Sequence, residues 1–112
     1  TSDTNREKLV DNKKSEEGGL SGLPIKDLST QMIKKFYKEV KKKIPIIGVG
    51  GVDSGPSAFE KIIAGATAVQ LYTGMVYKGP GIVKEIKKDL ISTLKKEKIK
   101  KIGDAVGINA WP

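Results

Sequence analysis

Residues 44–51 read IPIIGVGG, an apolar and largely β-branched run that ends abruptly in two glycines. The run does not alternate between apolar and polar residues, so it favours a strand buried on both faces, as in a parallel sheet. A second run, AVQLY at residues 68–72, predicts another short strand and ends at Thr73-Gly74. Buried strands of this kind need helices to cover them, which indicates an α/β fold.

Amphipathic segments precede and separate these strands. After Pro24 and Asp27 the sequence predicts a helix with apolar residues three and four apart on one face, namely Met32, Ile33, Phe36, Tyr37 and Val40. By this spacing Phe36 and Tyr37 are expected in the core. A second helix should start at a cap formed by Asp53 or Ser54, or one turn later through a Ser57-Ala58-Phe59-Glu60 capping box.

The second helix is expected to stop at Gly65, a residue type that commonly terminates helices. Beyond the second strand, a long amphipathic helix is predicted from about Pro80 to Glu97, and a small helical segment over residues 102–109. Helices and strands therefore alternate with short connections, which predicts βα units and a parallel sheet.

Composition limits the chemistry that this chain can supply. There is no Cys and no His among the 112 residues, which removes thiol nucleophiles and zinc sites built on thiolate or imidazole. We predict no metal site. The formal net charge is +8, which leaves a small basic nucleic-acid-binding module as an alternative from another functional class. Arg6 is the single arginine and aromatic residues make up 5% of the chain, so no nucleic-acid partner is expected.

The glycines at the strand ends predict an anion site. Gly50 and Gly51 close the first strand, and Tyr72-Thr73 closes the second. Each corner precedes a helix, whose first N–H groups are unpaired and carry partial positive charge, and glycine lets backbone approach an anion. Two such corners side by side would hold one phosphate. Neither the Rossmann glycine fingerprint nor a P-loop is present, which disfavours a dinucleotide or nucleoside triphosphate.

Five segments together resemble a known family. They are GGLSG at 18–22, IPIIGVGGVDSG at 44–55, EKIIAGATAVQLYTG at 60–74, YKGP at 77–80 and DAVG at 104–107. In this order and spacing they resemble the C-terminal part of the dihydroorotate dehydrogenases, most closely the quinone-dependent class 2. The alternative within flavin barrels is another FMN-dependent oxidoreductase, such as a tRNA dihydrouridine synthase-like enzyme, although GGLSG and YKGP weigh against it.

The resemblance implies a (β/α)8 TIM barrel that holds FMN at its mouth. Residues 18–112 would be the C-terminal βα units of this barrel, an incomplete domain, and residues 1–17 a polar flexible segment or loop. By the same resemblance, the cofactor-binding residues are Gly22, Gly50, Gly51, Tyr72 and Thr73.

The resemblance also implies an oxidation of dihydroorotate to orotate in pyrimidine biosynthesis, with quinone as electron acceptor. No catalytic residue is expected in this chain, because the family's base should lie upstream of residue 1, and the piece alone is expected to be inactive. Peripheral membrane association through an N-terminal region is implied, on the cytoplasmic side of the inner membrane. A cytoplasmic location is the alternative.

Overall fold

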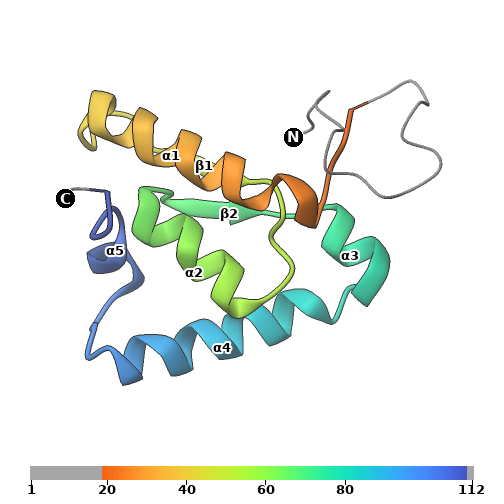
Figure 1. Cartoon of the computed structure of the whole chain (residues 1–112). Helices are drawn as coiled ribbons and strands as arrows, with labels where there is room; N and C mark the ends of the chain where they lie inside the picture. The colour runs from red at the N-terminus through yellow and green to blue at the C-terminus, as the bar shows by residue number, and fades with distance from the viewer. Residues whose placement is uncertain (1–18, 111–112) are drawn as a thin grey trace.

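The computed structural model describes residues 19–110, so the prediction of a flexible segment over residues 1–17 lies outside the described residues. The elements follow in chain order (Figure 1): η1 (Leu23–Ile25), α1 (Lys26–Val40), β1 (Ile47–Val49), α2 (Gly55–Ala64), β2 (Ala68–Gln70), α3 (Thr73–Lys78), α4 (Ile82–Lys96) and α5 (Ile102–Ala105). The predicted order of helices and strands is confirmed, with α3 as an additional short helix, and each strand is shorter than its apolar run. The segment predicted to be helical over residues 102–109 is helical over α5 alone.

The two strands form a parallel pair in which Gly48 lies opposite Val69. Each strand is followed by a helix, so the α/β fold with parallel strands is confirmed. Helix α2 packs against both α1 and α4. In Figure 1, η1 and α3 lie together at one end of the molecule, where the strands finish, and α5 lies at the opposite end.

Helix α1 buries only part of its apolar stripe. Ile33 and Tyr37 are buried as expected, whereas Phe36 is 56% exposed, so the prediction that Phe36 belongs to the core is wrong for the described residues. Phe36 lines an apolar groove of about 680 Å³ between α1 and β1. Ile47 also lines this groove and is 60% exposed. The expectation that β1 is buried on both faces is therefore wrong as well, because β2 is its one paired neighbour in the described sheet.

The start of α2 is fixed by two serines. Ser54 is the N-cap, and its side chain accepts a hydrogen bond from the N–H of Ser57, at 3.2 Å. The Ser57 hydroxyl oxygen in turn accepts from the N–H of Ser54, at 3.0 Å. This reciprocal box occupies Ser57, so the predicted box between Ser57 and Glu60 is wrong, and Ser54 rather than Asp53 caps the helix. Gly65 ends α2 as predicted, with a φ of 135° that suits glycine.

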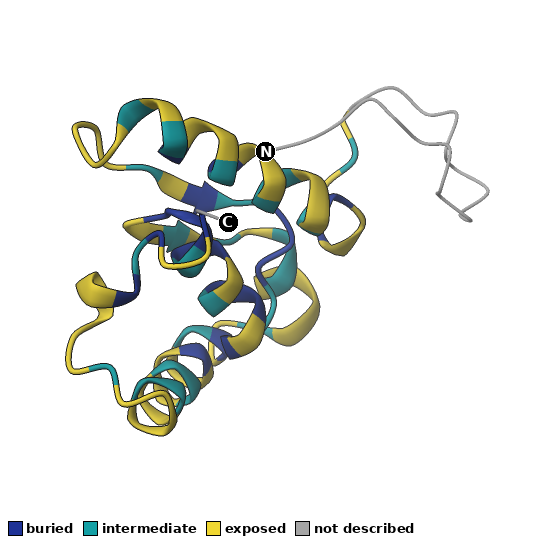
Figure 2. Ribbon diagram, turned by 60° about the vertical axis from the view of Figure 1, so that its left-hand side comes forward, coloured by how far each residue is buried: buried dark blue, intermediate teal, exposed yellow. Residues whose placement is uncertain are grey.

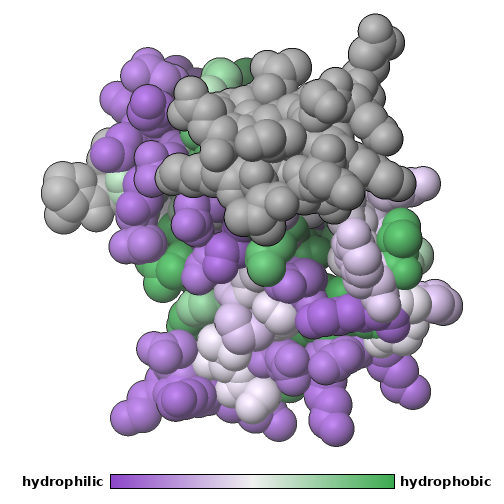
Figure 3. Space-filling view, turned by 45° about the vertical axis from the view of Figure 1, so that its right-hand side comes forward, coloured by the Kyte–Doolittle hydropathy of each residue, from purple (hydrophilic) through white to green (hydrophobic). Residues whose placement is uncertain are grey.

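Buried residues concentrate along α2 and on one face of α4 (Figure 2). One cluster consists of Val52, Ala58, Ile82 and Ile86. A second cluster of Ile33, Ala64 and Ala66 joins α1 to the other end of α2. The lower part of the face in Figure 3, where α4 lies, is largely hydrophilic, which fits lysines on a solvated helix surface.

Tyr37 connects α1 to the C-terminal segment. Its side chain is 4% exposed. A Cβ on Gly65 would lie 2.4 Å from the Tyr37 Cβ, and a Cβ on Gly107 would lie 2.2 Å from its Cζ. The N–H of Gly107 also donates to the carbonyl oxygen of Ile62 at 3.0 Å. The two glycines therefore leave the space that the ring fills, and the ring anchors the chain after α5.

Candidate functional site

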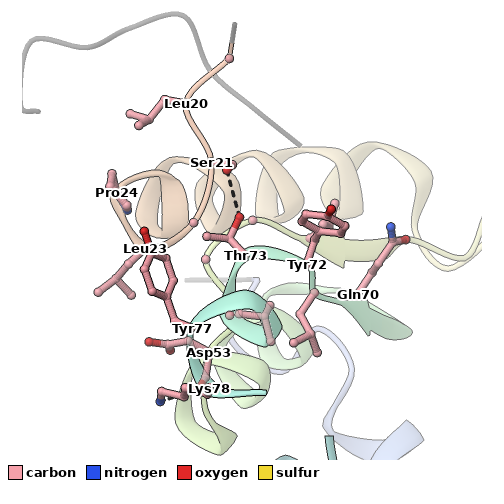
Figure 4. A pocket seen from close by; sticks show the side chains of 18 residues that line it. Leu20, Ser21, Leu23, Pro24, Asp53, Gln70, Tyr72, Thr73, Tyr77 and Lys78 are labelled. Atoms are coloured by element: carbon pink, nitrogen blue, oxygen red, sulfur yellow. Dashed lines mark hydrogen bonds between the residues drawn. The ribbon is translucent and has the colours of Figure 1, made fainter. Parts of the chain in front are cut away.

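A cavity of about 810 Å³ opens at the end of the molecule where both strands finish (Figure 4). Three stretches and two residues of α3 line it: residues 19–24, 49–53 and 70–74, with Tyr77 and Lys78. The loop before α1, the β1–α2 loop and the β2–α3 junction therefore meet around one space, because the strands are parallel and end at the same edge.

All five residues predicted to bind a cofactor line this cavity: Gly22, Gly50, Gly51, Tyr72 and Thr73. Their convergence is the arrangement expected for a single anion held between two strand ends. Ser21 and Thr73, which come from different stretches, share a hydrogen bond of 2.9 Å between their hydroxyl oxygens. Figure 4 shows this bond as a dashed line that joins the loop before α1 to the start of α3.

Backbone N–H groups are available at both corners. Thr73 and Gly74 are the first residues of α3, so their N–H groups have no acceptor within the helix. The N–H groups of Gly51 and Val52 form no hydrogen bond to another residue in the described part of the chain. Donors without acceptors beside an open cavity suit a phosphate, which accepts several hydrogen bonds at once.

The glycines serve a purpose that the sequence did not reveal. A Cβ on Gly51 would lie 2.4 Å from the Lys26 Cβ, and a Cβ on Gly50 would lie 2.9 Å from the Ser29 Cβ. Both glycines also have positive φ, 111° at Gly50 and 75° at Gly51. Their missing side chains therefore make room for the first turn of α1, rather than for the anion itself. The backbone of this corner remains free to line the cavity.

Thr73 and Tyr72 differ in how their side chains are used. The Thr73 side chain does not cap α3, because this helix has no side-chain cap hydrogen bond and Tyr72 is its N-cap residue. The Thr73 methyl carbon fills the space beside Gly22, where a Cβ would lie 2.9 Å from it. Tyr72 is 81% exposed, so its ring is not a packed core ring.

Asp53 and Lys78 also line this cavity, although no motif in the sequence places them there. Lys78 Nζ donates to the carbonyl oxygen of Asp53 at 2.8 Å, which joins the end of α3 to the β1–α2 loop. In Figure 4 these two side chains lie together, away from Ser21 and Thr73. Asp53 and Lys78 bring opposite charges to this side of the cavity, so their side chains give it no clear net preference for an anion.

The family model described as "Dihydroorotate dehydrogenase" matches residues 1–94 of this chain.

The chain belongs to the dihydroorotate dehydrogenase family.

Two curated relatives illustrate the similarity. The chain is 50% identical over 96 residues to "Dihydroorotate dehydrogenase (quinone), mitochondrial" of Mus musculus, covering 86% of this chain and 24% of the relative. It is 49% identical over 104 residues to "Dihydroorotate dehydrogenase (quinone)" of Bradyrhizobium diazoefficiens, covering 87% of this chain and 28% of that protein. The chain thus spans about a quarter of the length of these relatives.

A solved structure agrees in fold over the whole chain. The crystal structure of a ligand-free type DHODH from Eimeria tenella superposes with a TM-score of 0.94 at 37% sequence identity. The match covers 100% of this chain and 31% of that one. The sequence identity supports membership of the family, and the TM-score supports the arrangement of helices and parallel strands seen in this chain.

Proposed function

We propose that this chain forms the FMN phosphate site of a quinone-dependent dihydroorotate dehydrogenase. One observation carries the proposal: the glycine corner after β1 and the Tyr72-Thr73 corner after β2 line the same cavity. Family membership supports the choice of FMN over other phosphate-bearing ligands. When bound, FMN would accept a hydride from dihydroorotate and pass the electrons to a quinone.

The residues of this chain would bind and orient the cofactor. The N–H groups of Gly51 and Val52 and those of Thr73 and Gly74 would donate to phosphate oxygens, and the Thr73 hydroxyl would add a further hydrogen bond. Gly22 would keep the loop before α1 close enough to Thr73 to close this side of the cavity. The start of α2, with its Ser54–Ser57 box, would hold the β1–α2 loop in place. Proton transfer from substrate would fall to a base outside the described residues.

We also propose that residues 18–112 are βα units of a TIM barrel whose other units cover the apolar groove between α1 and β1. The 56% exposure of Phe36 and the 60% exposure of Ile47 support this, because large apolar side chains side by side on a strand edge favour a covering partner.

None of the described helices is both long and apolar enough to cross a membrane. Peripheral membrane attachment through another part of the enzyme remains part of the proposal.

Binding of FMN and of riboflavin, which lacks the phosphate, tests the site. We expect the natural polypeptide that carries these residues to bind FMN far more tightly than riboflavin. The variant Thr73→Val keeps the methyl group beside Gly22 and removes the hydroxyl, and should weaken FMN binding by roughly fivefold, the loss of one hydrogen bond. Flavin fluorescence titration of the apoprotein measures both affinities.

One result of the same titration would contradict the proposed phosphate site. Equal affinity for FMN and riboflavin would mean that no phosphate is held at these corners. Riboflavin binding should be unchanged in Thr73→Val, and a parallel loss for both flavins would point to general damage instead. Turnover of dihydroorotate with a soluble quinone, by the reconstituted polypeptide, then tests the reaction itself.

A further inference from the structure

One lysine differs from every other lysine that the structure describes. Lys61, on α2, has an exposed fraction of 0%, whereas the other lysines within residues 19–110 are partly or fully exposed. Lysine is almost never fully buried unless its ammonium has partners. Its burial inside a small α/β unit therefore needs a specific explanation.

The Lys61 ammonium binds the first turn of α1. Its Nζ donates to the carbonyl oxygen of Lys26 at 2.7 Å and to the Thr30 hydroxyl oxygen at 2.6 Å. The Thr30 hydroxyl donates to the same Lys26 carbonyl at 3.0 Å, so the three groups form a closed network. Because α1 begins at Lys26, this network fixes the position at which the helix starts.

That same turn lies directly against the cofactor corner. Lys26 limits the space beside Gly51, and Ser29 limits the space beside Gly50. The Ser29 hydroxyl also donates to the carbonyl oxygen of Val49, the last residue of β1. Lys61 therefore holds the turn from the α2 side, and the glycine corner packs on the turn from the strand side.

Packing alone would be served equally well by an apolar side chain of similar length, because moving an ammonium out of water carries a desolvation penalty that an apolar group does not have. That penalty lowers the pKa of Lys61 to about 8. Glu60 and Asp27 act in the opposite direction and raise the pKa, whereas Lys26 lowers it further. Among the other elements packed against α2, strands β1 and β2 carry no ionisable residue, and α4 places Asp89 beside Gly55, at the start of α2.

We propose that Lys61 is a positioning residue for the cofactor site: it holds the first turn of α1 against Gly50 and Gly51, and phosphate affinity depends on it. This inference rests on the proposed function, since the ligand whose affinity is affected is FMN. Lys61 does not line the cavity, so it acts through α1 and the glycine corner.

The variant Lys61→Met, made in the natural polypeptide, separates this role from simple packing. Methionine is unbranched and apolar, so it can fill the space without the charge. We expect FMN affinity to fall about tenfold or more, as when a charge-assisted hydrogen bond is lost, while riboflavin affinity stays unchanged. The midpoint of chemical unfolding should stay the same or rise. Lys84→Met, at an exposed position of α4, is the matched control and should change neither affinity.

Dependence on pH gives a readout that packing alone would not move. As pH rises through about 8, the Lys61 ammonium loses its proton in the folded protein, and its hydrogen bonds lose their charge. The phosphate of FMN stays doubly ionised above pH 7, since a phosphomonoester has a second pKa of about 6. Wild-type FMN affinity should therefore fall several-fold between pH 7 and 9.5. The affinity of Lys61→Met should show a flatter profile over the same range.

The outcomes distinguish this inference from the proposed function. If the wild type discriminates FMN from riboflavin but Lys61→Met binds FMN normally, the inference is overturned and the phosphate site stands. A drop in unfolding midpoint that parallels the loss of both flavins would likewise overturn it, because it would mark a structural role. If the wild type does not prefer FMN, the phosphate site itself is refuted.

A second variant tests the same network. Thr30→Val should also weaken FMN binding, and its effect should not add to that of Lys61→Met.

Discussion

Gly51→Ala is expected to destabilise the protein by roughly 3 kcal/mol or more and to weaken FMN binding by at least about tenfold. Gly51 has a φ of 75°, which an alanine adopts only with strain. The new methyl group would also lie 2.4 Å from the Lys26 Cβ, so either α1 or the corner must move. Chemical unfolding and flavin titration of the natural polypeptide measure the two effects.

Gly103→Ala is the matched control, because nothing lies within 4 Å of a Cβ at that position and Gly103 is within helix α5. Its effect should be small, and helix propensity favours alanine there. If Gly51→Ala unfolds at the wild-type midpoint and retains FMN, the close contact between the glycine corner and α1 does not exist in solution. Loss of stability with normal flavin affinity would separate that contact from the phosphate site.

Tyr37→Ala is expected to cost about 3–5 kcal/mol, the range for truncating a large buried aromatic side chain. The ring is 4% exposed and occupies the space between Gly65 and Gly107. Its removal leaves a cavity where α1, the end of α2 and the C-terminal segment meet. The midpoint of chemical unfolding should fall, and limited proteolysis should cut more readily near Gly107.

Tyr37→Phe is the control for this change. The Tyr37 hydroxyl lies 3.5 Å from the carbonyl oxygen of Val106, a long hydrogen bond that contributes little. Loss of the hydroxyl should therefore change stability by less than about 1 kcal/mol. A large loss in Tyr37→Phe, or a small one in Tyr37→Ala, would show that packing of the ring does not hold this region together.

Much of the fold followed from local patterns. The apolar runs predicted the strands, the spacing of apolar residues predicted α1 and α4, and Gly65 marked the end of α2. Phe36 was misassigned because spacing identifies the apolar side of a helix but not whether another element covers it. The Ser54–Ser57 box was missed because serine at a third helical position can replace the Glu or Gln of the usual capping motif.

The site was predictable in its residues but not in its contacts. Glycine-ended strands in consecutive βα units indicated which loops would meet, and the cavity brings those loops together. The direction of a missing Cβ depends on backbone torsion angles, so the contact of Gly50 and Gly51 with α1 could not be derived from residue identity. Lys61 did carry a usable signal, because it falls four residues after the buried Ser57 and three after the buried Ala58, on the inner face of α2.

The burial of Lys61 protects one amine of this lysine-rich chain from reagents in solution. Acylating reagents attack only amines that they can reach, so Lys84 and Lys88 on the outer surface of α4 should be labelled at once. Lys61 becomes accessible only when α1 lifts away from α2. The rate of its acylation, followed by mass spectrometry of peptides, would therefore report local opening between these two helices without any introduced probe.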